Sequence, residues 1–138
     1  MASFNKYTAA IEPLFEGINS GSDNWKVALA LTVNAADTTF VAGTTDLATG
    51  GGYTAGGNAA TVSSATQTGG TYKLVLNSPS IWTATGAGFT FRYVILYDAT
   101  TDTPVGYWDN SSNIPMSGVN GDTFQVNLDA TNGVFQAT

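Results

Sequence analysis

The stretch FTFRYVILYDATTDTPVGYWDN, residues 89–110, contains two runs rich in aromatic and β-branched residues with a polar loop between them. Such runs favour strands, whose side chains alternate between two faces. One face of residues 89–97 would be apolar throughout and the other apolar only toward its end, with Phe89, Phe91, Tyr93, Ile95 and Tyr97 on the first and Thr90, Arg92, Val94 and Leu96 on the second. The pattern predicts a central strand covered on both sides over part of its length.

The loop that follows contains Asp98 and Asp102, and residues 104–109 form the second run. Aspartate favours turns because its side chain bonds to backbone N–H groups just ahead of it in the chain. The spacing of the two aspartates resembles a calcium loop only loosely, since it lacks the alternating ligands, the central glycine and the terminal glutamate. We therefore predict a β-hairpin here in preference to a calcium site.

Other segments also have apolar side chains at every second position, or are bounded by residues that favour turns. Residues 25–32 predict a half-buried strand, with Trp25, Val27 and Leu29 on one face. Asn120-Gly121 and Asn132-Gly133 are dipeptides typical of type I′ turns, which need positive φ at both central residues. Further strands are expected within residues 60–64, 71–78, 81–82, 123–128 and 133–137. About seven or eight short strands indicate a mainly β fold, an antiparallel β-sandwich of jelly-roll or immunoglobulin-like type.

The chain length suits a single domain, residues 1–138. The spacing of apolar residues near the N-terminus differs from the spacing in the predicted strands. Apolar side chains recur every three to four residues over residues 3–18, which predicts a short N-terminal helix with one apolar stripe. Pro13 predicts a kink, or a second short turn beginning there. The helix would cap one end of the sandwich or pack on a neighbouring molecule. The stripe consists of Phe4, Tyr7, Ile11, Leu14, Phe15 and Ile18.

Residues 44–70 are rich in glycine, threonine and alanine and have few large apolar side chains, Tyr53 among them. Such a composition buries little surface. A loop of this length within a compact domain is usually functional or becomes ordered in an assembly. We expect residues 44–70 to form an extended arm or loop.

Composition excludes several classes of function. Charged residues make up only 10% of the chain, the net charge is −6, and the four basic residues are scattered. Four scattered cations do not neutralise a phosphate backbone, so we expect no nucleic-acid partner and no membrane-surface helix. The N-terminus lacks the pattern of a secretory signal, and no apolar run is long enough for a membrane span. A polar surface with so little charge is typical of a protein packed on a large partner.

The chain contains no histidine and no cysteine. Nucleophiles activated by histidine and metal sites built on histidine or thiolate are therefore excluded. Paired carboxylates remain, and Glu12 and Glu16 lie one helical turn apart, as exposed helix faces often show. The glycines at 50–52 and 56–57 lack the strand, helix and lysine of a phosphate-binding loop. We predict no enzyme, no cofactor and no metal site.

Four stretches, in this order, resemble a family of small structural proteins of tailed-bacteriophage virions. They are MASFNKY followed by DNWKVALAL near the start, residues 51–76, residues 91–109 and the ending GDTFQVNLDATNGVFQAT. Together they cover nearly the whole chain. Some members of the family resemble head decoration or cement proteins, which sit on the capsid shell. No catalytic residues are carried over from it.

The resemblance implies a non-enzymatic decoration protein on the outer surface of the phage head, with the major capsid protein as partner. Since such proteins often sit on local threefold axes, we expect a homotrimer. The residues expected at partner interfaces are Phe4, Tyr7, Ile11, Leu14, Tyr53 and Trp108. The alternative is a carbohydrate- or receptor-binding module of a tail or fibre, in which Trp82, Tyr107 or Trp108 stacks on a sugar near Asp109 and Asn110.

Overall fold

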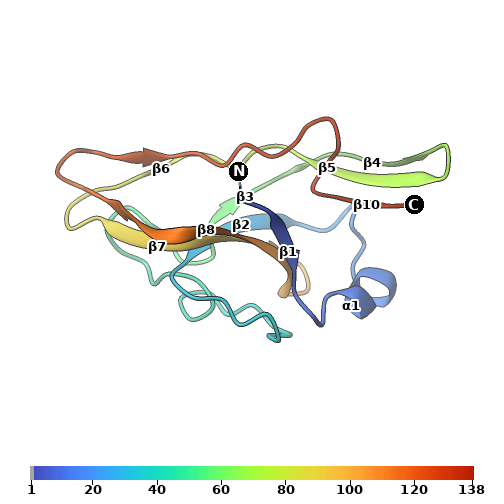
Figure 1. The fold of residues 1–138 in the computed structure, drawn as a ribbon, viewed down its shortest axis with the longest axis horizontal. Helices are drawn as coiled ribbons and strands as arrows, with labels where there is room; N and C mark the ends of the chain where they lie inside the picture. Colours follow the sequence, from blue (N-terminus) through green and yellow to red (C-terminus); the bar gives the residue numbers. More distant parts are fainter. Residues whose placement is uncertain (1) are drawn as a thin grey trace.

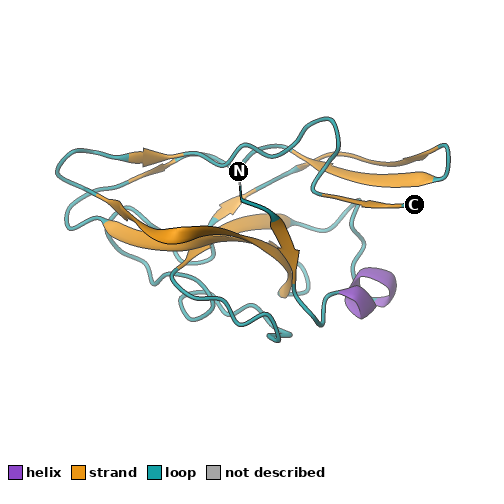
Figure 2. Cartoon of the chain, in the orientation of Figure 1, coloured by secondary structure: helices purple, strands orange, loops and turns teal. Residues whose placement is uncertain are grey.

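The computed structural model describes residues 2–138, and within them the chain forms antiparallel strands and one short helix (Figure 2). The fold is mainly β with a sandwich-like arrangement of sheets, as predicted. In chain order the elements are β1 (Phe4–Lys6), α1 (Ile11–Glu16), β2 (Trp25–Ala30), β3 (Asn58–Ala59), β4 (Val62–Thr68), β5 (Thr71–Leu76), β6 (Trp82–Thr83), β7 (Phe89–Asp98), β8 (Thr103–Met116), β9 (Thr123–Phe124) and β10 (Phe135–Ala137).

The largest sheet has the order β1-β8-β7-β2-β3, so the long strand β7 is central, as its apolar pattern predicts. A three-stranded sheet, β10-β5-β4, and the small pair β6-β9 lie over one face of it (Figure 1). The main core fills the space between these layers. It includes Val27 and Leu29 from β2, Leu74 and Leu76 from β5, and Leu96 from β7.

The hairpin of β7 and β8 forms as predicted, but the alternation along β7 is broken. The pairing shifts from Phe91 opposite Ile114 to Tyr93 opposite Asp109, which leaves a bulge in β8. The prediction that Phe91 and Tyr93 share a face is therefore wrong, and the change of face falls where the pairing of β7 with β8 is irregular. Phe91 packs in the main core, whereas Tyr93 faces the opposite side of the sheet.

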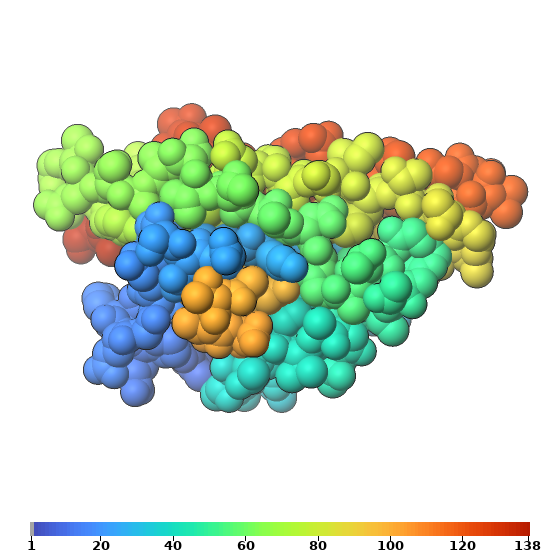
Figure 3. Space-filling view, turned by 180° about the vertical axis from the view of Figure 1, so that it is seen from behind, coloured from blue at the N-terminus to red at the C-terminus, as the bar shows by residue number. Residues whose placement is uncertain are grey.

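A second, smaller core covers that opposite side. Ala28 and Ala30 of β2 are as fully buried as Trp25, so β2 is not the half-buried strand that we predicted. The cover comes from the segment between β2 and β3, whose Phe40 stacks on Tyr97 with ring centroids 3.7 Å apart. Figure 3 shows this segment, in cyan and turquoise, packed against the body of the protein.

The N-terminal segment is not the helix over residues 3–18 that we predicted. Residues Phe4–Lys6 pair with β8 as an edge strand, and only residues Ile11–Glu16 are helical. Tyr7 continues the ladder, since its N–H donates to the carbonyl of Val105 at 3.0 Å. Pairing with β8 satisfies the backbone groups of this segment that face β8 and buries Tyr7, so tertiary pairing overrides the helical period.

Of the two alternatives predicted for residues 44–70, an extended arm or a loop, the structure shows a loop over residues 44–57, and this loop is packed on the domain. The carboxylate of Asp46, 6% exposed, accepts hydrogen bonds from the N–H groups of Gly43 and Gly56 and from the hydroxyl of Tyr53. The Tyr53 hydroxyl in turn accepts a bond from the N–H of Leu29 at 3.1 Å. These bonds fix the loop on strand β2, and the rest of the segment supplies β3 and β4.

Glycine makes this packing possible. Gly57 has φ +69°, and a Cβ there would lie 2.0 Å from the carbonyl oxygen of Val27. Only glycine allows the two backbones to approach this closely. The low content of large side chains in residues 44–57 therefore reflects tight backbone packing, where we had predicted a loose loop.

The type I′ turns predicted at Asn120-Gly121 and Asn132-Gly133 do not form. Both glycines have positive φ, but neither asparagine does, and a type I′ turn requires both. The turn of that kind lies at Gly69-Gly70 between β4 and β5, with φ values of +58° and +82°. Near the second dipeptide an aspartate side chain forms the turn instead. The carboxylate of Asp129 accepts hydrogen bonds from the N–H groups of Thr131 and Asn132.

Candidate interaction surface

Helix α1 is short, and local backbone hydrogen bonds close both of its ends. The N–H of Leu14 donates to the carbonyl of Ala10, and the N–H groups of Gly17 and Ile18 both donate to the carbonyl of Pro13. Pro13 lies in the first turn, where its missing N–H costs nothing. None of the helical residues is buried. Ile11 and Phe15 are exposed at the surface, whereas Leu14 is partly buried and packs against the main core.

An open groove of about 720 Å³ lies beside this helix. Strand β1 and helix α1 form one wall, and strand β10 forms the other, at the same end of the molecule (Figure 1). Phe15 is 83% exposed and Ile11 44% exposed. A patch of large apolar side chains with this much exposure marks an interaction surface. The lining residues are Phe4, Lys6, Ile11, Leu14, Phe15, Ser20, Tyr72, Val105, Phe135, Gln136 and Ala137.

Two open sheet edges border the same groove. β1 is the outer strand of the five-stranded sheet, and β10 is the outer strand of the three-stranded sheet. The N–H of Tyr7 is hydrogen-bonded to β8. Because hydrogen-bonded and non-hydrogen-bonded residues alternate along an antiparallel pair, the backbone N–H and C=O groups of Phe4 and Lys6 point away from β8. Lys6 is the only charged residue in the lining, and no carboxylate of the described chain lies within ion-pair distance of it.

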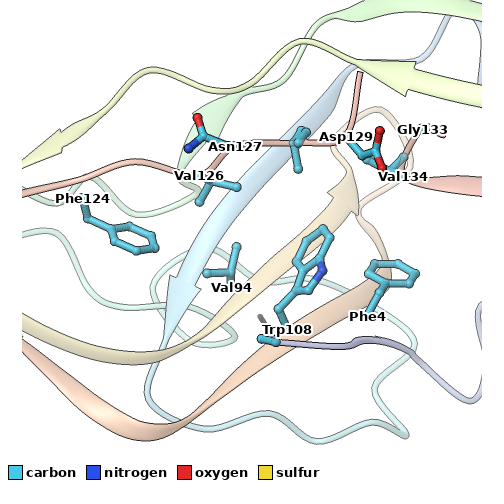
Figure 4. A pocket seen from close by; sticks show the side chains of 11 residues that line it. Phe4, Val94, Trp108, Phe124, Val126, Asn127, Asp129, Gly133 and Val134 are labelled. Atoms are coloured by element: carbon cyan, nitrogen blue, oxygen red, sulfur yellow. The ribbon is translucent and has the colours of Figure 1, made fainter. Parts of the chain in front are cut away.

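A second hollow, of about 340 Å³, opens between the five-stranded sheet and the chain that leads to β10 (Figure 4). Trp108 and Phe4 lie side by side on its floor, with ring centroids 4.8 Å apart. Asn127 and Asp129 lie at its opposite side. Both oxygens of the Asp129 carboxylate already accept bonds from Thr131 and Asn132 within their own turn, which lower its pKa.

The sugar-binding arrangement predicted around Trp108 is not assembled. Trp108 points toward the main core, while Asp109 is held by Arg92 through two hydrogen bonds of 2.8 and 2.9 Å. The guanidinium of Arg92 lowers the pKa of the Asp109 carboxyl, and both groups are partly exposed. Tyr107 faces the second core and packs edge-on against Tyr7. Trp82 is buried.

Four of the six residues predicted at interfaces border the two hollows. Phe4, Ile11 and Leu14 line the groove, and Phe4 and Trp108 line the second hollow. The other two, Tyr7 and Tyr53, are buried and offer no surface, so these assignments are wrong. Burial raises the pKa of both phenols above its ordinary range, and in Tyr53 the bond to Asp46 adds to the effect.

The opposite wall of the groove could not be placed from sequence. Tyr72, Phe135 and Gln136 lie in segments that we predicted as strands, but no sequence signal shows that β10 pairs with β5 opposite helix α1. Only the three-dimensional arrangement brings the two chain ends together.

The loop with Asp98 and Asp102 is a hairpin loop, as predicted. Asp98 is fully buried, and one of its oxygens accepts bonds from the N–H groups of Thr100 and Thr101. The other oxygen has no hydrogen-bond donor within residues 2–138 and meets the carboxyl of Asp23. Burial, followed by this contact with Asp23, raises the pKa of Asp98. Asp102 is exposed, with φ +53°, and does not share this environment.

Glu12 and Glu16 lie one turn apart on α1, and both are exposed to solvent. A glycosidase holds its two carboxylates on either side of a cleft, one of them with a raised pKa. These two glutamates lie together on one short helix instead. Within residues 2–138 no three acidic side chains gather in a way that could hold a metal ion.

Comparison of the chain with models of known protein families, with curated proteins and with solved structures found no match. Among the described residues, no helix has the length and apolar character needed to cross a membrane.

Proposed function

We propose that this chain is a non-enzymatic structural protein of a tailed-phage virion. In this proposal it decorates the outer surface of the head and cements the shell by contacts with the major capsid protein. It acts as a homotrimer, so that three copies of each contact surface meet the shell together.

The observation that carries the proposal is the apolar groove beside α1, in a chain with very little charge. Phe15 and Ile11 are exposed there, and both walls are open strand edges. Exposed apolar surface of this kind stabilises a protein only when a partner covers it. The resemblance in sequence to small virion proteins supplies the kind of partner.

The proposed mechanism is thermodynamic linkage. A protein that binds the assembled shell and not the free capsid subunit stabilises the shell by mass action. Many copies on a symmetric lattice and three sites per trimer raise the effective affinity, because each contact holds the next one near its site. No catalytic group is needed for this activity.

The test compares binding of two variants to purified shells. Phe15→Asp places a charge in the groove and should abolish co-sedimentation with the shell. Val119→Asp is the matched control, because Val119 is 92% exposed in the turn between β8 and β9, outside the groove. Equal binding of both variants and the native chain would contradict the assignment of the groove to the shell contact.

A second candidate function is a carbohydrate- or receptor-binding module of the tail or fibre. The hollow over Trp108 favours it, because an aromatic ring beside an amide side chain, Asn127, can stack on and bond to a sugar (Figure 4). A glycan array decides between the two functions. Selective binding that is lost in Trp108→Ala would support the module, and the decoration protein should bind no glycan selectively.

A further inference from the structure

The three-stranded sheet β10-β5-β4 ends in two open edges. β4 is the outer strand on one side and β10 on the other. β4 has seven residues, five of which are exposed, and it contains neither proline nor a charged residue. Open edges of this kind bind another strand unless charge, proline or a covering segment prevents it. Figure 3 shows residues of this region, in green, uncovered along the upper edge of the molecule.

The turn after β4 fixes which backbone groups are free. Gly69 and Gly70 form a two-residue turn, so Thr68 and Thr71 are the bonded pair that closes the hairpin. Bonding then alternates along the strand, and the N–H and C=O groups of Ala65 and Gln67 point outward. The edge thus offers a row of donors and acceptors to a further strand.

The two edge strands contain no charged residue, and the one charge of this sheet is Lys73 on the middle strand β5. Residues 47–72 contain no charged side chain, and neither do residues 130–138, although the whole chain has a net charge of −6. Two copies of an acidic protein repel each other least where their surfaces are uncharged. The two open edges of this sheet are therefore the places where a second copy can approach. By contrast, the three-residue edge β1 contains Lys6, a residue that protects strand edges from pairing.

The edge of β10 borders the apolar groove, but the edge of β4 does not. Pairing of β4 with β4 of another copy would satisfy one edge and leave the β10 edge open. Pairing of β4 with β10 satisfies both open edges of this sheet. A contact between two different surfaces repeats from copy to copy and closes into a ring when its rotation allows.

We propose that copies of this chain associate head to tail, with strand β4 of one copy added to the sheet edge at β10 of the next. The contact specifies how the homotrimer of the proposed function is held together, and it rests on that function only for the number of copies.

The chain has no cysteine, so introduced cysteines report this contact directly. Thr66 of β4 and Gln136 of β10 are exposed and lie on the same face of the sheet, each opposite Lys73 of β5. Within one copy they are two strand spacings apart, about 10 Å. That distance is too long for a disulfide within the chain, which needs Cα atoms less than about 7 Å apart.

The experiment oxidises single-cysteine variants separately and in equimolar mixtures. Ser64→Cys, Thr66→Cys and Thr68→Cys scan the outward face of β4, because the alignment of the two strands is not fixed in advance. Gln136→Cys labels β10. Disulfide-linked pairs should form in mixtures of Gln136→Cys with at least one β4 variant and in no variant alone. The native chain should have three times the 14.2 kDa mass of one chain by light scattering.

Three outcomes would overturn the proposal. They are a monomeric mass at the highest soluble concentration, cross-linking of a β4 variant with itself, and no cross-linking of Gln136→Cys with any of the three β4 variants. None of these measurements involves the shell. A monomer that still binds shells would contradict the head-to-tail contact and the homotrimer but not the contact with the shell. A cross-linked trimer that binds no shell would contradict the shell contact and leave the head-to-tail contact in place.

Discussion

Residues 44–57 and helix α1 both lie outside the sheets, yet they differ in how they are held. The glycine-rich segment keeps Tyr53 and Asp46 almost fully buried through a closed set of hydrogen bonds. Helix α1 has the larger proportion of apolar side chains, but it buries none of its residues and leaves Phe15 83% exposed. Close backbone approach and satisfied polar groups decide which segment belongs to the core, and apolar content alone does not.

The largest difference in stability is expected between two nearby positions of the N-terminal segment, one of which is buried and the other exposed. Tyr7→Asp puts a carboxylate into the second core, and we expect a loss of about 5 kcal/mol in the free energy of unfolding, enough to prevent folding. Ile11→Asp should change it by less than about 0.5 kcal/mol, because Ile11 is exposed. Urea unfolding measures both. Equal effects would contradict the boundary between core and surface drawn here.

Gly57→Ala tests whether the glycine-rich segment is packed or loose. The new Cβ would meet the carbonyl oxygen of Val27, and φ at this position is positive, so we expect a loss of about 3 kcal/mol. Gly69→Ala is the matched control, since φ is also positive there but no atom lies within 4 Å of the new Cβ. It should cost about 1 kcal/mol. Similar losses in the two variants, measured by thermal unfolding, would mean that the segment is not tightly packed.

Tyr53→Phe removes one hydroxyl from the closed set of bonds. The Asp46 carboxylate loses a donor and the N–H of Leu29 loses its acceptor, for which we expect about 2 kcal/mol. Tyr72→Phe is the control, because its hydroxyl bonds to Ser20 at the partly exposed wall of the groove. Water can replace that bond, so the loss should stay below about 1 kcal/mol. Chemical denaturation that ranks the two variants in the reverse order would contradict this account of the loop.

The smallest effect concerns Asp98, a buried carboxyl whose hydrogen bonding, unlike that of Asp46, is incomplete. Folding raises the pKa of Asp98 above 3.8, so the folded state holds this proton more tightly than the unfolded state. The stabilisation is fully present below pH 3.8 and is lost as the pH rises through the higher folded value. Relative to Asp98→Asn, the native chain should therefore become less stable as the pH rises.

The matching control for that pH series is Asp109→Asn. Arg92 lowers the pKa of Asp109, so the sign is opposite, and the native chain should gain stability relative to this variant as the pH rises toward 3.8. Urea unfolding at pH values on both sides of 3.8 measures both differences. Parallel curves for the two variants would show that burial beside Asp23 does not govern Asp98.

The β-rich fold, the central place of β7 and the hairpin after it could be predicted from the sequence, because strand period and turn residues are local signals. The bulge between Phe91 and Tyr93 could not, since it depends on how β8 pairs. The strand at Phe4–Lys6 was missed for a related reason. Its apolar residues fit a helical period equally well, and only the open edge of β8 decides between the two.

The candidate surface was predictable in part. Ile11 and Leu14 were assigned to an interface from their stripe, and the structure places both at the groove. The sequence places Tyr53 at an interface wrongly, because a tyrosine among glycines gives no sign that its hydroxyl donates a hydrogen bond to a buried aspartate, Asp46. Phe135 was expected in a strand, but the pairing that carries it to the groove joins it to Leu74, which is distant in the sequence.

The measurement that tests the central claim most directly is the number of copies of this chain in a purified virion, determined by quantitative mass spectrometry against the major capsid protein. The account predicts a ratio on the order of one copy per capsid subunit, as expected for symmetric decoration of the shell. A virion that contains only a few copies would contradict decoration of the head and would place the chain at the neck, tail or fibre.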